Sequence, residues 1–104
     1  MDFAYEKSLA LHAAVAERLR ADPALVERAR AKLETWIARG GRSVPLLIEW
    51  RPLLDGPLDT LLAFLTERSE RAAQLRSCSP FAGFLEPRER ERILRAVRRR
   101  HEAA

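Results

Sequence analysis

The sequence predicts an all-α protein, a single-domain bundle of five to six helices that starts with an α-hairpin. Leucine, alanine and arginine dominate and β-branched residues are few, which favours helices over strands. Apolar residues recur at intervals of three and four, and proline, glycine and capping residues separate these stretches. A chain of 104 residues is the size of one domain. Within 1–104 we expect a bundle core over 1–76, an apolar loop over 77–86, and a basic C-terminal helix and tail over 87–104.

The first helix is expected from about Asp2 to Arg20, with one apolar arc. That arc holds Tyr5, Leu9, Leu11, Val15, Ala16 and Leu19. Ser8 and His12 lie inside the same arc, one helical turn apart. We interpret His12 as a partly buried side chain, hydrogen-bonded in the core or at a groove edge; the alternative is a polar spot in a binding groove. The other histidine and the single cysteine lie far along the chain, so no metal site is predicted.

The second helix is expected to start at Asp22 and Pro23 and to end at Gly40 and Gly41. Aspartate is a favoured N-cap, and proline is favoured at the first helical position. Glycine accepts the left-handed conformation that closes many helices. Because the connection to the first helix is very short, we predict that these two helices pack as a hairpin.

The third helix is expected to carry the most apolar part of the chain, the run at 46–50. It follows Ser43, a candidate cap, with Pro45 in the first turn. We predict that this run is central to the core; if it were exposed, it would offer a homodimer surface. Pro52 is expected to kink or end the helix, because proline clashes with the preceding turn and donates no backbone hydrogen bond.

Two shorter helices are expected after the Asp-Gly-Pro break at 55–57. The fourth helix begins near Leu58 and has a broad buried face of leucines with Phe64 beside them. Either Thr66 or Ser69 is expected to cap a fifth helix that ends near Arg76.

The loop after the fifth helix is unusually apolar. Phe81, Phe84 and Leu85 lie in a short segment that Pro80 and Gly83 interrupt. One interpretation is a lid that folds onto the bundle and holds the last helix. The alternative is an anchor presented to a partner, since aromatic side chains and arginines are frequent interface hot spots.

The last helix, opened by Pro87, is strongly basic. Its only apolar patch is formed by Ile93, Leu94 and Val97. Residues 86–104 hold seven arginines and four glutamates, which leaves three of the four net positive charges of the chain in this segment. Four arginines lie within about 60° of one another on a helical wheel; they are Arg88, Arg92, Arg95 and Arg99. Such a row can bind carboxylates or phosphates, whereas an ordinary solvated face is the alternative.

No catalytic or cofactor-binding motif stands out. Arg95 and His101 fit the loose Arg-x(4–6)-His pattern of HEPN-type ribonucleases, but chance alone produces such a match in a tail with seven arginines. Cys78 has no obvious base beside it and is interpreted as an inert thiol. We therefore expect no enzyme, no cofactor and no metal.

The sequence also bears on the cellular compartment. A single cysteine is consistent with reducing surroundings. The N-terminus has no signal-peptide core, and no apolar run approaches the ~18 residues that suggest a membrane span. We expect a soluble, cytoplasmic protein with no membrane partner.

Two stretches, LHAAVAERLRADPALVERARAKLETW and SPFAGFLEPRERERIL, followed by a basic tail, resemble small helical bacterial antitoxins of type II toxin–antitoxin modules. The resemblance implies a non-catalytic protein that binds and masks a toxin enzyme and in some cases binds its promoter. The toxin class stays open. On this chain we infer that arginines engage an acidic or phosphate-binding surface and that apolar side chains anchor the contact. These candidate partner-binding residues are Phe81, Phe84, Leu85, Arg88, Arg92, Arg95 and Arg99.

An antitoxin that binds a co-encoded toxin through its loop and basic helix is the leading hypothesis. The alternative is a nucleic-acid-binding regulator that uses the same helix. No helix-turn-helix or zinc-finger pattern is evident, asparagine is absent, and Gln74 is the only glutamine. Contacts with DNA would therefore be directed mostly to the phosphate backbone and would weaken with salt.

Overall fold

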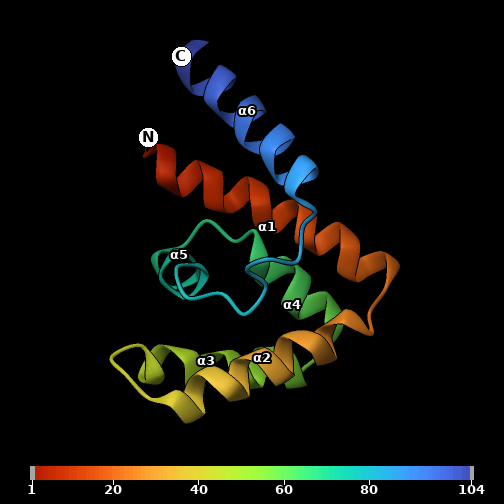
Figure 1. The fold of residues 1–104 in the computed structure, drawn as a ribbon, viewed down its shortest axis with the longest axis vertical. Helices are drawn as coiled ribbons and strands as arrows, with labels where there is room; N and C mark the ends of the chain where they lie inside the picture. Colours follow the sequence, from red (N-terminus) through yellow and green to blue (C-terminus); the bar gives the residue numbers. More distant parts are fainter. Residues whose placement is uncertain (1, 104) are drawn as a thin grey trace.

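In the computed structural model, which describes residues 2–103, the chain forms six helices and no β-strand (Figure 1). The helices are α1 (Phe3–Ala21), α2 (Leu25–Arg39), α3 (Val44–Asp55), α4 (Leu58–Leu65), α5 (Glu70–Arg76) and α6 (Pro87–Ala103). The all-α fold class is confirmed. The outermost positions of the predicted domain, 1 and 104, lie outside the described residues.

The helices stack in three layers. α6 packs along α1, the short helices α4 and α5 lie beneath α1, and α2 with α3 forms the layer beyond them (Figure 1). α1 contacts both α4 and α5, and α3 contacts the same two helices from the other side. The middle layer therefore supplies apolar side chains to both outer layers.

The predicted packed hairpin of the first two helices is wrong. Their connection is short, as expected, but α1 packs along α6 and α4, whereas α2 packs along α3. Figure 1 shows the two helices diverging from their turn, with the middle layer between them. The physical reason is that α4, α5 and α6 pack against α1, where Leu9, Ala16 and Leu19 of the apolar arc are buried, which leaves little of the arc for α2.

The second helix also begins later than predicted. Asp22 does not cap it; the Asp22 N–H donates to the Arg18 carbonyl and closes α1 instead. Pro23 then lies in a turn, and the helix begins at Leu25, whose N–H donates to the Asp22 carbonyl at 3.1 Å. The other end follows the prediction, since Gly40 adopts a φ of +77° and closes the helix.

The core is centred on Trp50, which is fully buried. Its indole N–H donates to the Leu75 carbonyl at 3.0 Å, so burial leaves no unsatisfied donor. The Phe64 and Phe81 rings meet the indole edge-on, with centroids 5.9 and 6.0 Å away. Within the run at 46–50 that was predicted to be central, Leu47 and Trp50 are buried and Leu46 is half-buried, but the prediction is wrong for Ile48. Ile48, at 42% exposure, is the one large apolar side chain of residues 2–103 that is exposed.

The remaining boundaries follow the sequence signals. α3 continues for three residues beyond Pro52, so the proline does not end it. Ser69 rather than Thr66 caps α5, and its hydroxyl accepts from the Ala72 N–H at 3.1 Å. Ser43 stands at the N-cap of α3, but its hydroxyl makes no capping hydrogen bond. No helix within residues 2–103 has the length and apolar character needed to cross a membrane.

Candidate functional site

The apolar loop at 77–86 folds onto the protein itself. Phe81 is 2% exposed and Phe84 is 9% exposed, and their rings meet edge-on with centroids 5.3 Å apart. Leu85 is half-buried and packs against the same core. The lid interpretation is confirmed for this loop. Contact of these side chains with a partner stays a prediction, one that requires the loop to open.

Two cations on α2 cover the outer side of this lid. The Arg28 guanidinium lies 4.7 Å from the centre of the Phe84 ring, within the range of a cation–π contact. The Lys32 ammonium donates to the Ala82 carbonyl. Gly83 has a φ of +84°, which other residues rarely adopt, so the loop turns here before it enters α6. α2 therefore holds the loop although α2 does not pack along α1.

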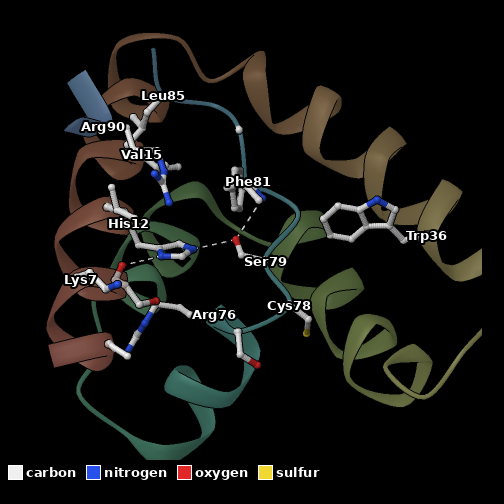
Figure 2. A pocket seen from close by; sticks show the side chains of 16 residues that line it. Lys7, His12, Val15, Trp36, Arg76, Cys78, Ser79, Phe81, Leu85 and Arg90 are labelled. Atoms are coloured by element: carbon white, nitrogen blue, oxygen red, sulfur yellow. Dashed lines mark hydrogen bonds between the residues drawn. The ribbon is translucent and has the colours of Figure 1, made fainter. Parts of the chain in front are cut away.

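A pocket of about 470 Å³ opens in the wedge between α1 and α2, and we call it the loop pocket. Its apolar lining includes Leu11, Val15, Trp36, Phe81 and Leu85, and its polar lining includes Lys7, Ser8, His12, Arg76, Ser79 and Arg90. Figure 2 shows the loop, with Ser79 and Phe81, running between His12 on one side and Trp36 on the other, and Arg90 and Arg76 on either side of His12. The lining thus comes mainly from α1 and the loop, and Trp36 is the contribution of α2.

A buried pair, His12 and Ser79, joins α1 to the loop. His12 Nδ1 lies 2.8 Å from the Ser8 carbonyl oxygen, and Nε2 lies 2.8 Å from Ser79 Oγ (Figure 2). A carbonyl can only accept, so Nδ1 carries the hydrogen. In the neutral ring Nε2 then accepts from the Ser79 hydroxyl, whose oxygen accepts in turn from the Phe81 N–H at 3.1 Å. This connected set of hydrogen bonds fixes the loop on α1.

The surroundings keep His12 neutral. Burial lowers the pKa of His12 below its ordinary value of 6.5, and the positive charge of Arg76 lowers it further. The hydrogen bond to the Ser8 carbonyl opposes this shift but is outweighed. Neutral His12 and the Ser79 hydroxyl have the contact of a general base with a nucleophile. However, Ser79 is only 6% exposed and its hydroxyl oxygen already accepts from the Phe81 N–H of the loop, so we assign the pair a structural role.

Arg76 is the second buried polar group at the loop pocket. Its Nη1 donates to the Glu67 carbonyl at 2.9 Å and to the Leu65 carbonyl at 3.4 Å, which satisfies the end of α4. Its guanidinium also lies 5.5 Å from the centre of the Tyr5 ring. Arg76 Nε and Nη2 are buried without a hydrogen-bond partner among the described residues. Within residues 2–103, no carboxylate forms an ion pair with this guanidinium, so its positive charge has no counterion there.

Cys78 also lines the loop pocket and is half-buried. Its Sγ lies 3.5 Å from the Leu75 carbonyl oxygen. Burial raises the pKa of this thiol from its ordinary value, and a hydrogen bond with Trp50 only partly opposes the rise. A raised pKa keeps the sulfur protonated and a poor nucleophile, in agreement with the inert thiol expected from the sequence.

The arginine face of α6, defined as Arg88, Arg92, Arg95 and Arg99, shares no residue with the loop pocket. All four side chains are exposed and line a shallow surface hollow with Pro87 and Glu91. Arg95 pairs with Glu91 at 3.2 Å. No ion pair with any of residues 2–103 holds the other three arginines of the face. The structure therefore brings the four predicted arginines together on one solvated surface.

α6 is held by its other side. Val97 is buried against α1, and the Ile93 and Leu94 side chains are half-buried beside it. Arg18 of α1 and Glu89 of α6 form an ion pair at 2.5 Å. The Phe3 and His101 rings have centroids 5.0 Å apart, so the end of the helix also contacts α1. His101 and Arg95 thus have different neighbours, Phe3 and Glu91, rather than sharing a cleft.

Sequence reasoning identified the arginine face but missed most of the loop pocket. Ser79, Arg76, Trp36 and Arg90 come from four different segments, and nothing in their local patterns brings them together. One signal was present: a histidine inside an apolar arc requires a buried partner. Among residues 2–103, no cluster of three or more histidine, cysteine or acidic side chains could hold a metal ion.

Comparisons with known proteins add no identity. No family model matches the chain, and neither a curated protein nor a solved structure is significantly similar to it.

Proposed function

We propose that this protein is a non-catalytic interaction protein of antitoxin type, whose arginine face binds an acidic surface of a co-encoded toxin. One observation carries the proposal. Arg88, Arg92 and Arg99 are exposed in a common hollow and have no ion-pair partner within residues 2–103. Guanidinium groups bind carboxylates in bidentate geometry, so an acidic protein surface complements this hollow.

The attachment of α6 supports a preformed binding surface. The helix contacts α1 through Val97 and the Arg18–Glu89 ion pair, which leaves its arginines turned away from the bundle. A partner therefore meets a helix that is already folded, and binding does not bear the entropy of ordering it. In this proposal Phe81 and Phe84 set the position of α6 from within the core, and the arginines make the contact.

A protein partner fits the hollow better than a nucleic acid does. Glu91 lies within the arginine face and pairs with Arg95. A carboxylate among the arginines repels a phosphate backbone, whereas it can pair with a basic side chain of a protein. The nucleic-acid-binding regulator remains the alternative function, and it predicts binding that falls steeply with salt.

The test is co-expression with the neighbouring reading frame of the native host. We expect the neighbour to be toxic when it is expressed alone and to be neutralised by, and co-purify with, this protein. Exchanging Arg88 and Arg92 for glutamate should abolish both effects. Exchanging Arg39 and Arg42, which are exposed elsewhere, for glutamate is the matched control and should change neither.

Two results would overturn the proposal. A harmless neighbour removes the antitoxin function. A partner that binds equally well after exchange of Arg88 and Arg92 removes the arginine face as its site. Salt-sensitive retention on DNA that these two exchanges abolish, without any protein partner, would establish the alternative instead.

A further inference from the structure

We propose that the loop pocket is a binding site for a small apolar carboxylate, separate from the arginine face. The pocket has a volume of about 470 Å³. This is within the range of roughly 300–1,000 Å³ that is typical of small-molecule sites. Side chains of α1, α2, α5, α6 and the loop all line it.

The apolar part of the lining selects the body of the ligand. Leu11 and Val15 of α1, Phe81 and Leu85 of the loop and Trp36 of α2 all line the pocket. Figure 2 shows Val15 on the α1 side of the loop and Trp36 on the other side. Burial of an apolar group against such a wall is favourable, because it removes apolar surface from water. The preferred body is therefore an alkyl chain or an aromatic ring.

The charged part of the lining selects an anion. Lys7, Arg76 and Arg90 come from three different helices, and no aspartate or glutamate within residues 2–103 lines the pocket. Arg76 contributes most to this preference, because it is almost fully buried and two of its nitrogens have no hydrogen-bond partner within residues 2–103. A buried charge without a counterion is unfavourable, so an anion that enters the pocket is stabilised by it.

The polar residues that line the pocket favour a ligand whose polar group is small and carries a single negative charge. His12 and Ser79 satisfy each other and add no charge to the lining. The three cations stand apart around it (Figure 2), rather than clustered as a polyphosphate site requires. A monocarboxylate can approach one of the other two cations, Lys7 or Arg90, while its apolar body lies against the apolar lining of the pocket. Separated cations next to an apolar lining therefore favour a small apolar monocarboxylate as the ligand.

Two natural reporters in the chain allow a direct test. Trp36 lines the pocket whereas Trp50 is buried in the core, so a change in tryptophan fluorescence that is lost in Trp36→Phe reports the pocket. Cys78 is the only cysteine and also lines the pocket, so a bound ligand should slow its alkylation by iodoacetamide. The probe is decanoate below its micelle concentration, compared with decan-1-ol and decylamine.

We expect saturable binding of decanoate, weaker binding of the alcohol and none of the amine. Arg90→Gln should weaken decanoate binding roughly tenfold, the usual effect of losing one charged hydrogen bond. Arg90 is exposed, so this variant should fold. Arg98→Gln, on the same helix but outside the pocket, is the matched control and should bind as the unchanged protein does.

Three results would overturn the inference. Decan-1-ol that binds as tightly as decanoate makes the pocket merely apolar. Equal binding by the Arg90→Gln and Arg98→Gln variants removes the anion site. Absence of a saturable signal in both reporters rejects small-ligand binding, and protection of Cys78 by the partner protein alone would identify the pocket as part of a protein interface.

Discussion

Arg76 and Arg92, which precede and follow the loop at 77–86 in the sequence, show one type of side chain in two opposite environments. Arg76 is almost fully buried beside the loop pocket and donates to two backbone carbonyls. Arg92 is exposed on α6 and forms no ion pair with the rest of residues 2–103. Removal of the first leaves buried acceptors unsatisfied, whereas removal of the second leaves the fold intact. Burial therefore separates arginines that serve folding from those available for binding.

The same contrast holds for the two regions as wholes. The loop pocket is built from α1, α2, α5, α6 and the loop, and its polar groups are connected by hydrogen bonds between distant segments. The arginine face is built from one helix and has a single ion pair, Glu91–Arg95, within that helix. Substitutions of the buried groups in the first region should act mainly on stability, and substitutions in the second mainly on binding.

Phe81→Ala gives the sharpest test of the loop as a structural lid and the largest expected loss of stability. The ring contacts both Trp50 and Phe84 edge-on. Removing a buried phenylalanine typically lowers the free energy of unfolding by about 3–5 kcal/mol. That is a large share of the roughly 5–15 kcal/mol that stabilises a domain. Urea unfolding measures it, and a loss as small as that of a surface substitution would contradict the lid.

Ser79→Ala tests whether the buried pair ties the loop to α1. The change removes the partner of His12 Nε2 and of the Phe81 N–H. An unsatisfied buried group costs about 1–3 kcal/mol, so we expect a loss of unfolding free energy in that range. Ser43→Ala is the matched control, because that hydroxyl makes no capping hydrogen bond. Equal stability of the two variants would show that the pair contributes nothing.

The protonation of His12 predicts a smaller, pH-dependent effect. Burial and the charge of Arg76 lower its pKa in the folded protein, while the unfolded chain titrates near 6.5. Between these two values the unfolded state binds a proton that the folded state does not. The stability gained by keeping His12 neutral is therefore fully present above pH 6.5. It is lost as the pH falls from 6.5 toward the pKa of His12 in the folded protein. Unfolding free energies measured across this range should fall less steeply with acid in His12→Gln; parallel curves would contradict the assignment.

Arg92→Gln should have the smallest effect on stability. The side chain is exposed and unpaired within residues 2–103, so the free energy of unfolding should change by no more than about 0.5 kcal/mol. Arg18→Gln is the informative comparison, because it removes the ion pair with Glu89 that links α1 to α6. We expect Arg18→Gln to be the more destabilising of the two. The reverse order would show that the arginine face is part of the fold.

Local patterns predicted most elements but few of their contacts. Three helix ends depend only on neighbouring residues. Ser69 caps α5 with its side chain, Gly40 ends α2 with a positive φ, and Pro87 begins α6, where its missing N–H costs no hydrogen bond. The arginine face was predicted from local sequence as well, since helical spacing alone puts its four arginines on one side of the helix. The boundary at Asp22 failed because the residue closes α1 rather than opening α2.

The sequence by itself determined an all-α fold, a core contribution from the apolar run at 46–50 and a basic last helix. Periodicity, caps and charge are local properties, and each constrains the chain within a few residues. Only the tertiary structure decided that α1 packs along α6 rather than α2. It also decided that His12 meets Ser79, 67 positions away, beneath a lid of phenylalanines. Such contacts depend on which apolar faces cover one another. All the helices together decide this, so the sequence of one segment does not predict it.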